Sequence, residues 1–408
     1  MTLSSSSFPT RDPGPRTRAR PGILCRFLDQ ALPALQAGRL QLVLPNGEAI
    51  YRSGDHPGPA ATVSLRCWRG LWRILMEGEN GVSNGYLDGD WSTPDLSQLL
   101  ELGMHNGAAL TPRAKSWLSS LTSNRILHFL RANTRRGSRR NIAAHYDLGN
   151  NFFLTWLDAG MNYSSALYAE GDTLEDAQMR KLDRAASLLD LKGSERVLEI
   201  GCGWGGLAER LIRRHGSTVL GVTLSTEQLA YAQARLAGAI RRGRADLRLM
   251  DYRDIVGRYD RIASIEMLEA VGERYWPVYF AKLRSSLRNG GIAVLQVITI
   301  DERRFAGYRK HPDFIQRHIF PGGQLPTASI IEREAARAGL KLVHWESFGD
   351  SYAKTLREWR SRFLLAWPII EPLGFNERFR RTWEYYLTYC EIGFRFGVVQ
   401  VGFFKFVG

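Results

Sequence analysis

Residues 197–206 read VLEIGCGWGG, and this stretch decides the fold of the 408-residue chain. It starts as a short apolar strand and ends in glycines at 201, 203, 205 and 206. Glycines allow a tight turn and let a ligand approach the backbone N–H groups at the start of the next helix. Cys202 inside the stretch is expected to pack as a small residue rather than to act as a nucleophile. The stretch therefore predicts a ligand site at the end of a strand.

Strand and helix signals alternate around this stretch from residue 141 onward. Helical periodicity covers residues 174–192 and 226–242. Short β-rich runs lie at 217–224 (STVLGVTL), 246–252 (DLRLMDY), 259–267 (YDRIASIEM) and 291–300 (GIAVLQVITI). Such alternation is typical of a parallel, doubly wound sheet. We therefore predict an α/β chain with a Rossmann-like domain over residues 141–408.

The region before this domain differs in composition and in its pattern of apolar runs and turns. Residues 1–20 are polar and rich in Arg and Pro, and are expected to be disordered. Residues 21–125 alternate short apolar runs with glycine-containing turns, which predicts a smaller mixed α+β domain. Residues 126–140 are expected to form a basic linker.

The chain carries 55 Lys and Arg against 41 Asp and Glu, a net charge of +14. No acid occurs from Leu102 to Tyr146, while eight bases and several large apolar residues do. Such a segment suits an anionic membrane surface, but it is also typical of a solvated linker, and a basic chain can bind nucleic acid. No secretory signal and no apolar stretch long enough to span a bilayer is present, so we expect a cytoplasmic protein that lies on the inner face of the membrane.

The cysteines and histidines carry less information. The four cysteines are scattered without a CxxC pair, which disfavours a disulfide framework or a zinc finger. The eight histidines form no ligand pattern, so no metal site is expected.

Several ordered motifs resemble the cyclopropane-fatty-acyl-phospholipid synthase family, which includes the mycolic acid methyltransferases. Outside the glycine stretch they are HYDLGN at 145–150, MNYS at 161–164, EAVGERYW at 269–276, IFPGG at 319–323, SYAKTL at 351–356 and YYLTYCEIGF at 385–394. The resemblance spans residues 141–408 and implies a class I methyltransferase that uses S-adenosylmethionine.

The resemblance also implies the reaction and its demands. The family transfers a methyl group to a cis double bond in a phospholipid acyl chain, and a base then removes a proton so that a cyclopropane ring closes. The alkene is a poor nucleophile and the cation reacts with water, so the site must align the reactants and stay dry. Proton loss elsewhere would give a methyl- or methylene-branched chain, or a furan precursor. Relatives include homodimers.

Two other classes are less consistent with the sequence. Nucleic-acid N-methyltransferases carry an Asn/Asp-Pro-Pro-aromatic motif after the fourth strand, whereas residues 265–269 read IEMLE without a proline. An inactive lipid-binding protein would not need the full glycine stretch. The cofactor is also not expected to be NAD, because Thr223-Leu224-Ser225 stands where a dinucleotide enzyme usually carries an acidic residue.

The resemblance places the cofactor on residues that follow the strands of the predicted sheet. These are Tyr163, Ser164, Glu199, Gly201, Cys202, Gly203, Gly205, Thr223, Leu224, Gln228, Asp251 and Tyr252. Among them, Tyr252 matches an aromatic residue that stacks on adenine.

At the reacting centre the family uses a bicarbonate ion as base. Glu269, Tyr352 and Cys390 match three residues that hold it. Two other ligands differ, because Ser165 replaces a Cys and Gln296 replaces a His. Neither replacement accepts a proton at neutral pH as an imidazole does.

Glu266 is a third difference, since it stands where the family has glycine. On a helix, Glu266 and Glu269 would share one face and push one carboxyl pKa upward. One hypothesis is that Glu266 or the pair replaces the base or helps to hold it. The alternative is a structural role, such as a hydrogen bond to Gln296 or to the cofactor.

Overall fold

The computed structural model describes residues 28, 32, 34–110 and 148–408. The predicted tail at 1–20, the predicted linker at 126–140, the boundary at 125 and residues 145–147 of the HYDLGN motif lie outside these residues. Two sheets are present in the described part, one of four strands and one of seven.

The smaller sheet belongs to the N-terminal domain and has the strand order β2-β1-β3-β4. Its elements are β1 (Ala37–Val43), β2 (Ala49–Ser53), β3 (His56–Leu65), α2 (Trp68–Glu77), α3 (Glu79–Leu87), β4 (Trp91–Ser92) and α4 (Leu96–Leu110). Alternate strand residues such as Leu42, Ile50 and Val63 are buried, as expected for a sheet with one face on a core. The predicted small mixed domain is confirmed.

The larger sheet has the order β10-β11-β9-β8-β5-β6-β7. Its strands are β5 (Arg196–Ile200), β6 (Thr218–Thr223), β7 (Ala245–Leu249), β8 (Tyr259–Ile265), β9 (Leu287–Ile300), β10 (Lys341–Ser347) and β11 (Val399–Val407). The five strands from β7 to β9 are parallel, which confirms the prediction for that part. The prediction of an entirely parallel sheet needs correction, because β11 and β10 run antiparallel at the edge next to β9.

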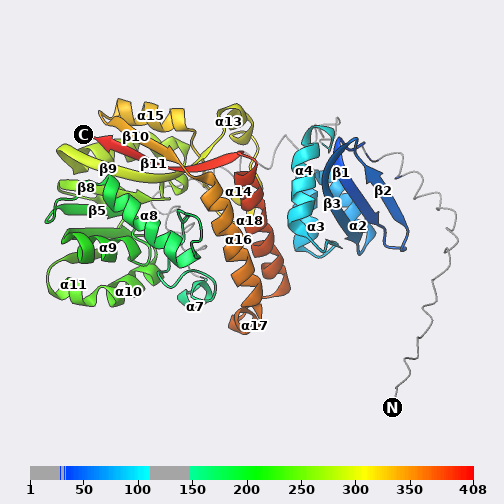
Figure 1. Cartoon of the computed structure of the whole chain (residues 1–408), viewed down its shortest axis with the longest axis horizontal. Helices are drawn as coiled ribbons and strands as arrows, with labels where there is room; N and C mark the ends of the chain where they lie inside the picture. The colour runs from blue at the N-terminus through cyan, green and yellow to red at the C-terminus, as the bar shows by residue number, and fades with distance from the viewer. Residues whose placement is uncertain (1–27, 29–31, 33, 111–147) are drawn as a thin grey trace, which may run out of the picture.

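Helices cover both faces of this sheet (Figure 1). They are α7 (Asn150–Phe153), α8 (Leu174–Leu188), α9 (Gly206–His215), α10 (Thr226–Arg235), α11 (Ala237–Arg241), α12 (Trp276–Ser286), α13 (Glu302–Tyr308), α14 (Phe314–His318), α15 (Ala328–Arg337), α16 (Gly349–Leu365), α17 (Trp367–Ile370) and α18 (Glu377–Arg395). Val197 packs with α8 and α9 in one cluster, and its neighbour Leu198 packs with α12 and α15 in another. Successive strand residues point to opposite faces, so the two clusters form the two core layers.

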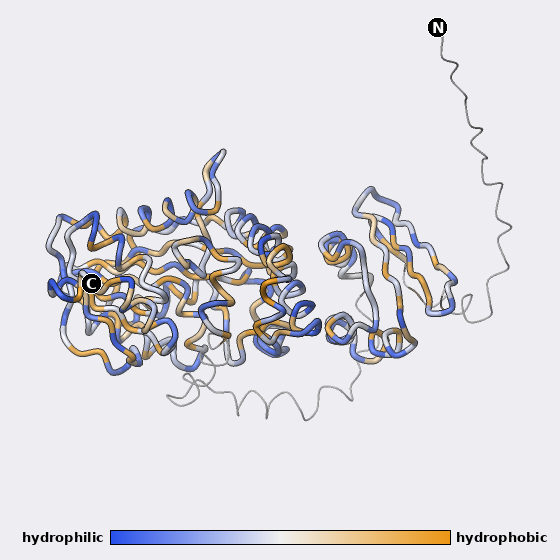
Figure 2. Tube along the Cα trace, turned by 90° about the horizontal axis from the view of Figure 1, so that it is seen from below, coloured by the Kyte–Doolittle hydropathy of each residue, from blue (hydrophilic) through white to orange (hydrophobic). Residues whose placement is uncertain are grey.

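The long helices α16 and α18 stand between the seven-stranded sheet and the N-terminal domain (Figure 1). On α18, Glu384 accepts a hydrogen bond from the Tyr86 hydroxyl at 3.0 Å, and Arg381 donates to the Tyr86 carbonyl at 3.2 Å. Figure 2 shows hydrophobic residues gathered toward the inside of each domain and hydrophilic residues on outer turns. In the described part of the chain, no helix combines the length and hydropathy that a bilayer span requires.

Candidate active site

A cavity of about 2630 Å³ lies at the carboxyl ends of the parallel strands. Its wall includes the glycine loop after β5, the ends of β6 and β8, and part of α18. It continues into the N-terminal domain, where Leu42, Val63 and Leu71 line it. Typical small-molecule pockets measure ~300–1,000 Å³, so this cavity has room for more than one ligand.

The glycine loop sits where the strand order reverses, between β5 and β8. Ligands of open α/β sheets bind at such a switch point. Gly201 and Gly205 have φ values of 83°, a region that glycine occupies without strain. Gly205 begins α9, and a Cβ atom on it would lie 3.2 Å from the side chain of Ala232. A Cβ on Gly203 would meet no heavy atom within 4 Å, because this residue faces the cavity.

Glu199 precedes this loop and is buried, with burial raising its pKa to about 8. Glu199 lines the cavity, and its buried Oε2 atom has no hydrogen-bond partner among the described residues. The Tyr252 hydroxyl also has no hydrogen-bond partner among the described residues, and burial raises its pKa to about 12. Buried polar atoms are nearly always satisfied, so both atoms fit a ligand with polar groups such as S-adenosylmethionine.

Most residues predicted to bind the cofactor line this one cavity. They are Tyr163, Ser164, Glu199, Gly201, Cys202, Gly203, Thr223, Leu224, Gln228 and Tyr252. The cavity lining lacks Gly205, which caps α9, and Asp251, whose carboxylate accepts from Arg253 Nε at 2.8 Å. Asp251 also caps the short helix Tyr252–Asp254, so it holds the turn that carries Tyr252. Burial raises the pKa of the Cys202 thiol, which suits a packing residue.

The two glutamates Glu266 and Glu269 do not share a helix face, so that prediction is wrong. Glu266 follows the end of β8 with a φ of 50°, in the left-handed region. Glu269 lies in the separate short helix Leu268–Ala270. The side chains nevertheless interact, because the charge of Glu266 contributes to the raised pKa of Glu269.

Three donors converge on the Glu266 carboxylate. The backbone N–H of Ser165 donates at 2.8 Å, Gln296 Nε2 at 2.7 Å and the Tyr352 hydroxyl at 2.8 Å. The structural alternative of a bond between Glu266 and Gln296 is therefore present. Burial raises the pKa of Glu266, and these hydrogen bonds oppose the rise.

Glu269 has a poorer set of partners. Its Oε1 accepts from the backbone N–H of Ile298, while Oε2 faces the cavity without a partner among the described residues. Burial, followed by the charge of Glu266, raises its pKa to about 8. Of the two carboxyls, Glu266 therefore has the better-stabilised charged form, because three hydrogen bonds oppose the rise of its pKa.

Lys181 is a site residue that the sequence analysis missed. It lies on α8, is fully buried, and donates from Nζ to Ser164 Oγ at 2.6 Å. Burial lowers the pKa of Lys181 to about 8. The negative charge of Glu266 is the largest influence that opposes this lowering. The signal was available, because position 181 falls on the buried stripe Leu174, Ala177, Gln178, Leu182 and Ala185.

Cys390 lines the part of the cavity formed by α18, as does the neighbouring Tyr389. Burial raises the pKa of the Cys390 thiol, so it remains neutral and does not act as a base. The ring of Tyr352 on α16 packs against the ring of Phe394 on α18, with centroids 4.5 Å apart and the planes tilted by 33°. The reacting centre is thus walled by aromatic rings and a neutral thiol.

The residues present do not fit a bicarbonate ion. Tyr352 matches one of its ligands, and Ser165 and Gln296 replace two others. The Tyr352 hydroxyl, the Gln296 amide and the Ser165 backbone N–H all donate to the Glu266 carboxylate. An added anion would have to displace that carboxylate inside a buried pocket, where two like charges repel strongly. No group of three His, Cys, Asp or Glu side chains that could hold a metal ion occurs in residues 34–110 or 148–408.

Comparisons with known proteins agree with this geometry. Tuberculostearic acid methyltransferase UfaA1 of Mycobacterium tuberculosis is 40% identical over 338 residues, 81% of this chain and 79% of the relative. The cyclopropane-fatty-acyl-phospholipid synthase of Escherichia coli K12 is 37% identical over 335 residues, 81% of this chain and 83% of the relative.

Solved structures match the catalytic part. The cyclopropane synthase MmaA2 of M. tuberculosis superposes with a TM-score of 0.63 at 31% identity, over 66% of this chain and 98% of that one. The mycolic acid cyclopropane synthase CmaA1, complexed with SAH and CTAB, gives 0.63 at 29% over the same shares. The profile of the family described as mycolic acid cyclopropane synthetase matches residues 133–404. The chain belongs to the mycolic acid cyclopropane synthetase family.

Proposed function

We propose that this chain transfers a methyl group from S-adenosylmethionine to the cis double bond of an unsaturated phospholipid acyl chain. The observation that carries the proposal is the single cavity that joins the glycine loop, the carboxylate pair and the apolar wall of the N-terminal domain. The name of the E. coli relative supports a phospholipid substrate, and the CmaA1 complex with SAH supports the cofactor.

The cofactor supplies an electrophilic methyl group when it is bound. The residues of this chain align the alkene, exclude water and stabilise the positive charge that forms on the alkene. One alkene carbon forms a bond to the methyl carbon as its bond to sulfur breaks, and the other alkene carbon becomes cationic. The Glu266 carboxylate is the group we assign to stabilise this cation and accept the proton. Lys181 and the three donors hold that carboxylate in place and ionised.

The cyclopropane product follows when the proton leaves the added methyl group and the ring closes. This is our first assignment, since the family profile and the E. coli relative are named for it.

A specific observation favours a methyl- or methylene-branched product as the second candidate. The base is a carboxylate of the chain, fixed by three hydrogen bonds, instead of a separate ion. A differently placed base removes a different proton from the same cation. The name of the relative at 40% identity, tuberculostearic acid methyltransferase, supports a fatty-acid methylation other than ring formation.

The decisive experiment is NMR of the lipid formed from S-adenosylmethionine and monounsaturated phospholipid by the purified chain. Upfield ring protons identify the cyclopropane, and olefinic or branched-methyl signals identify the second product. Mass alone does not separate them, because both add one carbon and two hydrogens. Cofactor binding without methylation of any lipid would overturn the proposal, and methylation of RNA or DNA would replace it.

We further propose that the enzyme works as a peripheral protein on an anionic membrane, on the cytoplasmic side, and as a homodimer. The net charge of +14 supports an anionic surface. The basic residues behind this proposal, Arg135, Arg136, Arg139 and Arg140, lie outside the described residues. Sedimentation with vesicles and the solution mass of the full chain test the two parts separately.

A further inference from the structure

Helix α2 of the N-terminal domain exposes large apolar side chains to solvent. Four of its residues are exposed by 42%, 64%, 56% and 55%, namely Trp68, Trp72, Leu75 and Met76. Their spacing of four, three and one residues places them on one stripe about 100° wide. Monomeric soluble proteins rarely gather several large apolar side chains in one exposed patch unless it has a partner.

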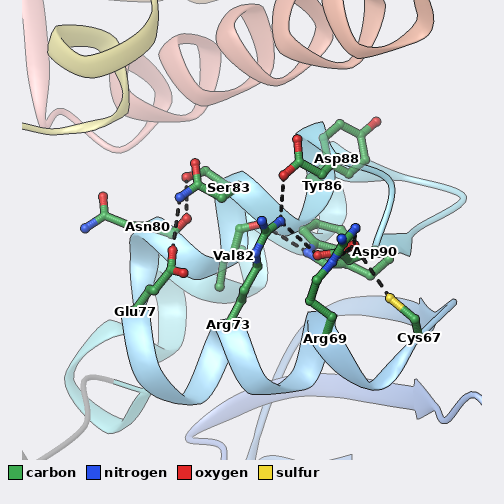
Figure 3. Close-up of polar contacts among 12 residues, drawn as sticks. Cys67, Arg69, Arg73, Glu77, Asn80, Val82, Ser83, Tyr86, Asp88 and Asp90 are labelled. Atoms are coloured by element: carbon green, nitrogen blue, oxygen red, sulfur yellow. Dashed lines mark hydrogen bonds and ion pairs between the residues drawn. The ribbon is translucent and has the colours of Figure 1, made fainter.

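The apolar face of α2 continues from this stripe to the side that meets the cavity. Leu71 and Ile74 line the cavity, and Gly70 is buried. The two arginines of the helix are already engaged, because Arg73 pairs with Asp88 at 2.6 Å and Arg69 bonds to Asp90, as Figure 3 shows. The exposed stripe itself contains only apolar side chains and tryptophan rings, and both arginines beside it are paired with aspartates.

The outer stripe also joins the cavity. Leu75 and Met76 are exposed and line the cavity at the same time. An apolar surface thus runs without interruption from the outside of α2 to the interior. Helix α2 is amphipathic, because Arg69, Arg73 and Glu77 form a polar side beside its exposed apolar face, and such a helix suits the interfacial layer of a membrane.

We propose that the outer face of α2 inserts into the interfacial layer of a membrane and admits the acyl chain past Leu75 and Met76 into the cavity. This inference rests on the proposed lipid substrate. Tryptophan side chains favour the headgroup level of a bilayer, which suits Trp68 and Trp72. The acyl chain would then pass from bilayer to cavity without contact with water.

The charge of the chain supports an anionic membrane as the occupant of this face. An anionic surface attracts a chain with a net charge of +14. Helix α4 lines the same cavity with Leu99 and Leu100, and it leads directly into the acid-free stretch that ends at Tyr146.

The test compares two triple variants of the full chain by sedimentation with vesicles of monounsaturated phosphatidylglycerol and phosphatidylethanolamine. The first variant is W72S/L75S/M76S. The matched control is L365S/I369S/L373S, whose residues are exposed by 80%, 65% and 46% at the far end of α16. We expect the first variant to bind vesicles about tenfold more weakly or worse, and the control to bind as the wild type.

Two further readouts separate this inference from the proposed function. Methylation of lipid in detergent micelles should be retained by a further variant, W68S/W72S, because neither tryptophan lines the cavity. Quenching of tryptophan fluorescence by brominated lipids should fall in W72F, which shows insertion without any turnover.

Three results would overturn the inference. They are unchanged vesicle binding of the first variant, an equal loss in the control, or a change of oligomeric state in the first variant, which would make the face a protein interface. Absence of methylation by the wild type would instead refute the proposed function and leave the vesicle comparison intact.

Discussion

Glu266 stands at the end of β8 with a φ of 50°, where few residues other than glycine are found. Three hydrogen bonds from Ser165, Gln296 and Tyr352 hold its side chain. A strained backbone of this kind persists only where the surroundings impose it, and such positions cluster at functional sites.

The first prediction concerns the charge of Glu266. Glu266→Gln should lower turnover at least about 100-fold while S-adenosylmethionine still binds, because an amide cannot accept the proton. Turnover with monounsaturated phospholipid and calorimetric cofactor binding measure the two effects. Glu332→Gln, on an exposed part of α15, is the control. Full turnover of Glu266→Gln would remove the carboxylate from the mechanism.

The second prediction concerns the proton of Glu269. The folded protein holds this proton up to a pKa of about 8, whereas the unfolded chain releases it near the ordinary value. Stability of the apoprotein should therefore fall as pH rises from about 5 to about 8. Glu269→Gln lacks this proton loss, so its melting temperature should exceed that of the wild type by a margin that grows over the same range. A margin that is constant with pH would contradict the assignment.

The third prediction concerns Lys181, which faces Glu266, Asp158 and Glu199 in the buried site. Lys181→Met keeps much of the volume and removes the positive charge, so the pKa of Glu266 should rise. Because Glu266 must be ionised to act as base, the acid limb of the kcat/KM profile should move to higher pH. Lys354→Met, at an exposed position on α16, should leave the profile unchanged. An unmoved acid limb in Lys181→Met would restrict Lys181 to packing.

At the scale of elements, the candidate site residues lie at the ends of the parallel strands, and the helices pack on the sheet that holds them. The glycine loop, Thr223 and Glu266 follow β5, β6 and β8 in the parallel part of the sheet. Parallel strands bring their carboxyl ends to one edge, so residues far apart in the chain meet there. The helical periodicity of residues 174–192 and 226–242 is confirmed. The first range contains α8, and the second contains α10 and α11.

The fourth prediction tests the turn that starts α9. Gly205→Ala places a Cβ 3.2 Å from Ala232 at a φ of 83°, so we expect destabilisation of about 1–3 kcal/mol and weaker cofactor binding. Gly171→Ala is the matched control, because its φ is 80° and its Cβ would meet no atom within 4 Å. Denaturant unfolding of both variants separates backbone strain from close packing. Equal losses would mean that the contact with Ala232 is unimportant.

At the scale of the whole molecule, α18 links the two domains. It carries Cys390 to the cavity, and it bonds the N-terminal domain through Glu384, Arg381 and the pair Arg378–Asp88 at 2.9 Å. The apolar cavity can therefore extend across both domains. Apolar residues of the N-terminal domain and residues of the catalytic domain therefore line one cavity.

The fifth prediction concerns the basic stretch and salt. Changing Arg135, Arg136, Arg139 and Arg140 to Glu should weaken binding to anionic vesicles and leave cofactor binding intact. The effect should shrink at high ionic strength, because salt screens charge, whereas the loss caused by the α2 variant should persist. Vesicle sedimentation at two salt concentrations checks this. Unchanged binding at low salt would return the stretch to the role of a solvated linker.

The sequence by itself determined the strand–helix alternation and the glycine loop, because these depend on local periodicity and on a motif next to a strand end. The expected cofactor residues came from the family resemblance, and most of them line one cavity. It also predicted the small N-terminal domain. It did not predict the antiparallel strands β10 and β11, since pairing partners are chosen by packing over long sequence distances.

Only the tertiary structure decided which groups face one another. The donors of Glu266 come from positions 165, 296 and 352, and no local pattern ties them to position 266. The same holds for Lys181 beneath the cofactor wall and for the outer face of α2 at the mouth of the cavity. Hydrogen bonds, burial and the pKa values that follow from them depend on distances in space, and these exist only once the chain has folded.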